Sequence, residues 1–157
     1  IQPMYNLVKR QAEVEIFPMA VSENIGVINY SPTGGGLLSG KYAGIKRPKI
    51  GRLIENKMYE ARYNDSKMFD VAEKFATLSK KLGYSPISLA IAWAKSHPAV
   101  TAPIIGGRNT EQLKDSIDSL KIEMTSELRE KISNISIDPP PATDRNEENT
   151  EHNNGQR

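Results

Sequence analysis

The residues that could do chemistry in this chain gather in one glycine-rich run, Tyr30 to Tyr42. Its sequence, YSPTGGGLLSGKY, places hydroxyl side chains and glycines directly after a short apolar run. Because glycine has no Cβ, a strand that enters such a loop can bring backbone amides close to a phosphate. Lys41, the last residue but one of the run, could face the same anion. The run matches neither the P-loop nor the GxGxxG pattern, so the residues alone leave open a phosphate cradle and a plain surface turn.

The elements that must position this run alternate along the chain. Apolar residues three and four positions apart predict a helix that Gly83 ends. Ser85 and Pro86 are typical of a helix start. The expected strands are 2–7, 27–30 and 101–105, and the expected helices are 16–24, part of 53–62, 68–82, 87–96 and two that start at the capping residues Thr110 and Thr125.

Strands that are separated by helices pair in parallel through right-handed crossovers, so the sequence predicts an α/β fold. The strands 27–30 and 101–105 both run into glycine-rich loops at the C-terminal edge, where such sheets bind ligands. Three parallel strands are too few to close a sheet, which indicates part of a barrel or of a larger open sheet. The strand-like start at Ile1 suggests a piece of something longer, and we expect the polar tail 139–157 to be disordered.

Composition narrows the class of protein. The chain has 157 residues, as expected for one domain, and its formal net charge of +2 gives no argument for a nucleic acid or an anionic membrane as partner. The absence of cysteine excludes disulfides and thiolate nucleophiles and is compatible with a cytoplasmic protein. With only two histidines, we expect no metal site. Trp93 is expected in the core, and Glu13 and Glu15 are expected to serve a helix N-terminus.

Three ordered motifs resemble the aldo-keto reductase family. They are QPMYNLVKR at Gln2–Arg10, YSPTGGGLLSGKY at Tyr30–Tyr42 and PIIGGRNTEQLKDSI at Pro103–Ile117. The match covers roughly Ile1 to Asp138 and resembles the last three strand–helix units of the family's (β/α)8 TIM barrel. The resemblance therefore implies that residues 1–138 are the NADP-binding portion of such a barrel.

The resemblance also implies an oxidoreductase that reduces aldehydes and ketones by hydride transfer from NADPH, with a small carbonyl compound as substrate. It implies that Gln2 binds the nicotinamide carboxamide and that the nicotinamide ring stacks on Tyr30. Thr33 and Ser116 depart from the family's usual leucine and asparagine. The other implied NADP(H) contacts are to the pyrophosphate from Ser31, Pro32, Thr33, Gly40 and Lys41, to a phosphate from Arg52, near the 2′-phosphate from Gly106 and Arg108, and to adenine and ribose from Gln112, Asp115 and Ser116.

The largest departure from the family is an absence. The family's catalytic aspartate, tyrosine, lysine and histidine come from earlier strands, and nothing in this chain aligns with them. We therefore assign no catalytic residue, expect no reductase activity from the chain alone, and expect it to associate with the missing half of the barrel. Two alternatives are a non-catalytic NADP(H)-binding regulatory subunit, since some family members are accessory subunits of membrane channels, and an inactive truncated product. Without the resemblance, Tyr30 could equally be an aromatic residue that ends a strand or a platform for a ligand. Arg108 in such a place is more often a solvated cap residue than a phosphate contact.

Overall fold

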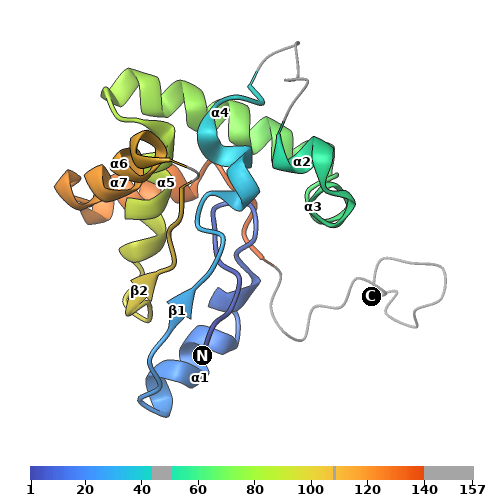
Figure 1. The fold of residues 1–157 in the computed structure, drawn as a ribbon. Helices are drawn as coiled ribbons and strands as arrows, with labels where there is room; N and C mark the ends of the chain where they lie inside the picture. Colours follow the sequence, from blue (N-terminus) through green and yellow to red (C-terminus); the bar gives the residue numbers. More distant parts are fainter. Residues whose placement is uncertain (44–50, 108, 140–157) are drawn as a thin grey trace, which may run out of the picture.

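The computed structural model describes residues 1–43, 51–107 and 109–139, in which helices pack on a small parallel sheet (Figure 1). Strand β1 (Ile28–Asn29) pairs in parallel with β2 (Ala102–Pro103), with Ile28 opposite Ala102. The first residues add a third extended segment, since Tyr30 N–H donates to the Pro3 carbonyl at 3.0 Å. Met4 and Tyr30 form a single parallel bridge. The predicted α/β fold with parallel pairing is confirmed for these residues.

The strands are shorter than predicted. The expected strand 2–7 joins the sheet through one bridge, at Met4, rather than as a continuous strand, and the expected strands 27–30 and 101–105 are reduced to β1 and β2. Pro3 and Pro103 have no N–H to give to a ladder, which limits pairing on both sides of β1.

The described part of the chain also forms seven α-helices and three short 3-10 helices. The helix ends follow local signals: the Thr125 Oγ1 accepts from Leu128 N–H at 3.2 Å, and Gly83 takes φ 76° after α4. The helices are α1 (Ile16–Ser22), α2 (Arg52–Glu55), α3 (Lys57–Arg62), α4 (Ser66–Leu82), α5 (Pro86–Lys95), α6 (Thr110–Asp118) and α7 (Ser126–Ser133), and the 3-10 helices are Gln11–Glu13, Gly34–Ser39 and Ser119–Lys121.

Several predicted helix ends differ from the structure by one or two residues, because the expected helices 16–24, 68–82 and 87–96 are α1, α4 and α5. Thr110 is the first residue of α6 rather than its cap, because the Asn109 side chain accepts from Gln112 N–H at 2.9 Å. The expectation that part of 53–62 is helical is confirmed. Asn56, extended at φ −125°, divides this stretch into α2 and α3 and caps α3. Residues 140–157 of the predicted tail 139–157 lie outside the described residues.

One face of the sheet forms the core and the other is open. Side chains alternate along an extended chain, so Tyr5 and Val27 face the helices, and both are fully buried. Tyr5 stacks on Trp93 of α5 with ring centroids 5.1 Å apart, and Trp93 is fully buried as predicted. On the opposite face Ile28 and Ile104 remain 44% and 41% exposed, so this face has no covering layer in the described chain.

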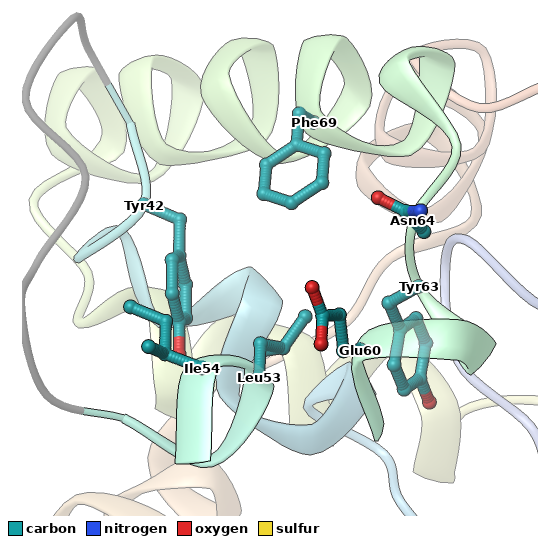
Figure 2. A pocket seen from close by; sticks show the side chains of 7 residues that line it. All are labelled: Tyr42, Leu53, Ile54, Glu60, Tyr63, Asn64 and Phe69. Atoms are coloured by element: carbon teal, nitrogen blue, oxygen red, sulfur yellow. The ribbon is translucent and has the colours of Figure 1, made fainter. Parts of the chain in front are cut away.

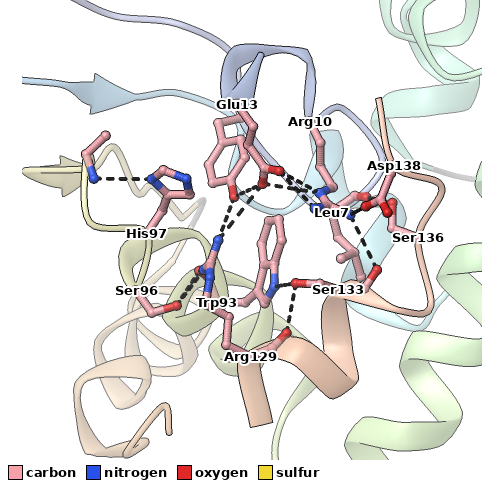
Figure 3. A network of polar contacts seen from close by, with 12 residues as sticks. Leu7, Arg10, Glu13, Trp93, Ser96, His97, Arg129, Ser133, Ser136 and Asp138 are labelled. Carbon is pink, nitrogen blue, oxygen red and sulfur yellow. Dashed lines mark hydrogen bonds and ion pairs between the residues drawn. The ribbon is translucent and has the colours of Figure 1, made fainter. Parts of the chain in front are cut away.

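Glu13 was expected to serve the electrostatics of a helix N-terminus, and this prediction was wrong. Its carboxylate accepts the Tyr5 hydroxyl and pairs with Arg10 at 2.8 Å, inside a polar network that faces the core (Figure 3). Burial acts to lower the Arg10 pKa, but the hydrogen bonds and charge of Glu13 outweigh it and raise that pKa above its ordinary value.

Within residues 1–43, 51–107 and 109–139 no helix is long and apolar enough to cross a membrane.

Candidate functional site

Gln2 and Tyr30 share one face of the sheet. Tyr30 lies opposite Met4, and two residues earlier Ile28 N–H donates to the Ile1 carbonyl at 2.9 Å, which sets Gln2 beside Ile28. Residues two apart on an extended chain point to the same side. The Gln2 side chain is exposed and the Tyr30 side chain is half-buried. The structure therefore places the two residues expected at the nicotinamide on the same open face.

Ser31 turns the chain from β1 into the glycine-rich run. Its φ of 59° is in the left-handed region, which residues other than glycine rarely adopt. Its Oγ accepts from Gly35 N–H at 3.1 Å, and its carbonyl accepts from the Asn6 Nδ2 at 3.0 Å. The corner is thus held from both sides by hydrogen bonds.

The glycine turn, which we define as residues 34–39, follows this corner as a short 3-10 helix with a kink. Gly34, Gly35 and Gly36 have φ of 62°, 64° and 93°, so the turn can be built only from glycines without strain. The Thr33 carbonyl accepts from Gly36 N–H at 3.1 Å, and Pro32 is buried beneath it. The predicted loop is therefore a folded turn that packs against α4 and α5 (Figure 1).

Two cations border the glycine turn. Lys41 is exposed, and its ammonium lies beside Gly36, where an added Cβ would be 3.6 Å from Nζ. Gly40 precedes it with φ 83° and closes the turn. Arg52 is the first residue of α2, and its guanidinium lies 5.2 Å from the centroid of the Tyr59 ring. Lys41 thus places a positive charge beside the glycine turn, and Arg52 adds another on α2, which contacts that turn.

The second predicted part of the site follows β2. Ile104 N–H donates to the Asn29 carbonyl at 2.8 Å, so the chain leaves β2 beside the corner at Ser31. Gly106 is exposed with open space where a Cβ would point, and Arg108 lies outside the described residues. On α6, Gln112 is exposed and Asp115 is half-buried.

Ser116 has a different environment from the other predicted adenine and ribose contacts. It is only 4% exposed, and its hydroxyl donates to the Gln112 carbonyl within α6 at 3.3 Å. Asp115 also has a partner, since the Ser85 hydroxyl lies 3.4 Å from its Oδ2. The structure thus presents Gln112 to solvent and turns Ser116 inward, and the role of each remains a prediction.

A cavity of about 120 Å3 lies between residues 51–64 and α4 (Figure 2). The Tyr42 hydroxyl in its wall is buried, with no hydrogen-bond partner among the described residues. Figure 2 shows Tyr42 on one side of the cavity and Asn64 on the other. None of the predicted cofactor residues is among the residues that line it. The lining residues are Tyr42, Leu53, Ile54, Glu60, Tyr63, Asn64 and Phe69.

Sequence reasoning missed two residues that hold the corner at Ser31. Asn6 and Tyr63 are both fully buried, and the Asn6 Nδ2 donates to the Tyr63 hydroxyl at 3.3 Å. Burial raises the Tyr63 pKa, while hydrogen bonds from Ser31 and Asn6 act against that rise, so the hydroxyl stays protonated. Asn6 lies inside the motif QPMYNLVKR, but its type alone gives no sign of this contact. Nothing in the sequence near Tyr63 signals it either.

The sequence is similar to a known protein family and to several curated proteins. The sequence model of the aldo/keto reductase family matches residues 1–137. An uncharacterized oxidoreductase of Bacillus subtilis is 37% identical over 138 residues, which are 85% of this chain and 39% of that protein. A probable voltage-gated potassium channel subunit beta of Oryza sativa subsp. japonica is 32% identical over 150 residues, or 91% of this chain and 45% of that protein. A probable aryl-alcohol dehydrogenase of Saccharomyces cerevisiae is 28% identical over 135 residues, or 85% and 41%. The chain thus spans about two fifths of the length of these relatives.

Proposed function

The chain belongs to the aldo/keto reductase family of oxidoreductases, and we propose that it forms the NADP(H)-binding part of an enzyme that reduces aldehydes and ketones to alcohols. One observation carries this proposal: Gln2 and Tyr30 lie on the same open sheet face, and the chain runs from Tyr30 directly into the glycine turn. A flat ring platform and an amide donor beside an anion-binding turn suit a nicotinamide dinucleotide. A small polar ligand without a phosphate would have no use for the backbone amides of the glycine turn.

The residues present fit such a dinucleotide. A Cβ at Gly36 would occupy the space toward the Lys41 ammonium, so glycine there keeps the approach to the backbone open. When bound, the dinucleotide supplies a hydride. Gln2 would bind the carboxamide, Tyr30 would stack on the ring, and the phosphates would be held by the turn and its cations. The proposed phosphate and adenosine contacts are Ser31, Pro32, Thr33, Gly40, Lys41, Arg52, Gly106, Arg108, Gln112, Asp115 and Ser116.

We further propose that residues 1–138 supply the last three strand–helix units of a (β/α)8 barrel. The exposed side chains of Ile28 and Ile104 would then pack toward the barrel interior, against strands outside this chain. The chain itself is assigned no catalytic residue, because the family's proton donor belongs to those other strands. A sequence without cysteine is compatible with a cytoplasmic location.

An NADPH titration of the purified chain tests this proposal, with NADPH absorbance followed in the presence of an aromatic aldehyde. We expect saturable binding and no consumption of NADPH. Lack of binding would refute the proposed site, and reduction of the aldehyde by this chain alone would refute its lack of a proton donor. The expected inactivity follows from general acid catalysis, since the alkoxide formed by hydride transfer needs a proton.

A second candidate function is a nucleotide-binding subunit without catalysis. It is favoured by the 32% identity to probable voltage-gated potassium channel beta subunits of Oryza sativa and Arabidopsis thaliana. The same aldehyde assay on a polypeptide that carries the whole barrel separates the two. An enzyme would turn over, and a sensing subunit would bind NADPH with little or no turnover.

A further inference from the structure

Three side chains from distant parts of the chain meet at the corner where β1 enters the glycine turn. Asn6 comes from the first extended segment, Ser31 follows Tyr30, and Tyr63 directly follows α3. The Tyr63 hydroxyl lies 3.4 Å from the Ser31 Oγ and accepts from the Asn6 Nδ2 at 3.3 Å. Asn6 also donates to the Ser31 carbonyl at 3.0 Å, so the three groups form a closed set of contacts.

Each anchor of this corner is itself fixed. The Asn6 Oδ1 accepts from Val8 N–H at 3.1 Å, which leaves its Nδ2 aimed at Ser31 and Tyr63. The Tyr63 hydroxyl is also 3.6 Å from the Met4 Sδ, to which it can donate. Both anchors are fully buried. A buried and satisfied polar set of this kind favours one arrangement, because any other leaves a polar group without a partner.

The backbone at the corner needs this support. Ser31 has φ 59°, a conformation that is strained for a residue other than glycine and persists only where its surroundings determine it. The Ser31 Oγ in turn accepts from Gly35 N–H at 3.1 Å, so the rotamer of Ser31 and the path of the glycine turn are coupled. A change at the Tyr63 hydroxyl therefore reaches the turn through one intermediate side chain.

We propose that Tyr63 is a positioning residue for nucleotide binding, whose hydroxyl, together with Asn6, holds Ser31 in its left-handed conformation and so presets the glycine turn for a pyrophosphate. This inference rests on the proposed NADP(H) site and adds a residue to it. Tyr63 does not contact the dinucleotide in this account. We expect its effect to be greatest at the pyrophosphate, because the contacts of Tyr63 lead through Ser31 to the glycine turn.

The substitution Tyr63→Phe removes only the hydroxyl and keeps a ring that packs 3.4 Å from a Cβ built at Gly35. Tyr59→Phe is the matched control. Tyr59 lies one helical turn earlier on α3 and stacks with Tyr63 at a centroid distance of 6.5 Å, but its hydroxyl takes no part in the contacts at Ser31. Both variants thus remove one oxygen from the same tyrosine pair.

The experiment compares calorimetric titrations of the full chain and both variants with NADPH and with adenosine 2′-monophosphate, which has no pyrophosphate. We expect Tyr63→Phe to raise the Kd for NADPH roughly tenfold and that for the monophosphate less than about twofold. Tyr59→Phe should change neither. Hydrogen exchange at residues 34–38 should be faster in Tyr63→Phe than in Tyr59→Phe before any nucleotide is added.

A second variant separates positioning from general stability. Ser31→Gly adopts a positive φ without strain, so in that background Tyr63→Phe should raise the Kd for NADPH less than about threefold. Equal NADPH affinity in the parent and Tyr63→Phe would overturn the inference and leave the proposed function standing. Equal losses for both ligands, or an undiminished effect in the Ser31→Gly background, would assign Tyr63 a general structural role and also overturn it. If the parent chain does not bind NADPH, the proposed function fails and the inference fails with it.

Discussion

The Arg129 guanidinium of α7 donates to the Tyr5 hydroxyl at 3.0 Å and so joins the last helix to the first extended segment (Figure 3). Its other Nη donates to the Trp93 carbonyl and to the Ser96 Oγ, each at 2.7 Å. The guanidinium also lies 4.9 Å from the Trp93 ring centroid. Burial raises the Tyr5 pKa, and the hydroxyl keeps its proton for Glu13. Arg129 of α7 therefore links the first extended segment to the end of α5 on the core side of the sheet.

Arg129→Ala is predicted to lower the free energy of unfolding by about 2–4 kcal/mol. It removes the ion pair with Glu13 and the hydrogen bond to the Trp93 carbonyl, and both of these groups are mostly shielded from water. The side chain of Arg129 is only 20% exposed. Urea denaturation followed by tryptophan fluorescence measures the change. Lys131→Ala, at an exposed position of the same helix, serves as control and should shift stability by no more than about 0.5 kcal/mol. Equal effects of the two substitutions would contradict the role given to Arg129.

His97 is predicted to make stability depend on pH. Its ring lies 4.5 Å from Phe17 between centroids, and its Nδ1 accepts from Ala99 N–H at 3.2 Å, which requires an unprotonated Nδ1. Burial, and then the charges of Arg129 and Arg10 against that of Glu13, lower its pKa below the ordinary value. The unfolded chain therefore binds a proton near pH 6.5 that the folded chain does not, so stability falls as the pH drops below about 6.5, until the folded His97 itself protonates.

Unfolding curves at a series of pH values test this dependence, with His97→Asn as the comparison. Asparagine keeps an acceptor near Ala99 N–H but does not titrate. The parent should lose stability relative to this variant by at most about 1.4 kcal/mol per pH unit across the window below about pH 6.5. Parallel curves for the two proteins would show that His97 does not contribute.

The local signals of the sequence predicted most of the helices. Gly83 ends α4 and Thr125 caps α7 because these residues act on their own backbone, within a few positions. The cap of α6 was placed one residue late, since Asn109 and Thr110 can both cap and only the chain's path decides between them. The strands came out shorter than predicted because proline at positions 3 and 103 removes ladder donors, a penalty that depends on which strand lies alongside.

The site could be predicted only in part for a related reason. Tyr30 and the glycine turn are contiguous in sequence, and alternation along two paired segments suffices to bring Gln2 to the same face. The contacts of Tyr63 with Ser31 and of Arg129 with Tyr5 join residues separated by 32 and 124 positions. No periodicity or capping rule reaches over such separations. These contacts become visible only when the helices are packed.

Alanine substitutions at three glycines should give graded losses of stability. Gly106 has open space and no positive φ, so Gly106→Ala should be nearly neutral. Gly83 has φ 76° and open space, so Gly83→Ala should cost about 1–2 kcal/mol through its backbone alone. Gly35 has φ 64°, and its Cβ would lie 2.6 Å from the Tyr59 ring, so Gly35→Ala should cost more than either.

Thermal unfolding of the three glycine variants measures this order. A double variant, Gly35→Ala with Tyr59→Leu, removes the ring atoms that the new Cβ would meet. It should destabilise by less than the sum of the two single substitutions, because the contact that each change disturbs is shared. A loss for Gly35→Ala no larger than that for Gly83→Ala would show that Tyr59 moves aside without cost.

Substitutions at the two ends of the proposed site should be distinguishable by the nucleotide used. Tyr30→Leu removes the ring expected under the nicotinamide and should raise the Kd for NADPH about three- to tenfold, the range of an aromatic contact, while leaving that for 2′,5′-ADP unchanged. Gln112→Ala acts on the adenosine end and should weaken both ligands by the same factor. Tyr84→Leu, at an exposed tyrosine after α4, is the control and should change neither. If Tyr30→Leu weakened 2′,5′-ADP as much as NADPH, Tyr30 could not lie at the nicotinamide, and the direction in which the dinucleotide crosses the glycine turn would have to be reversed.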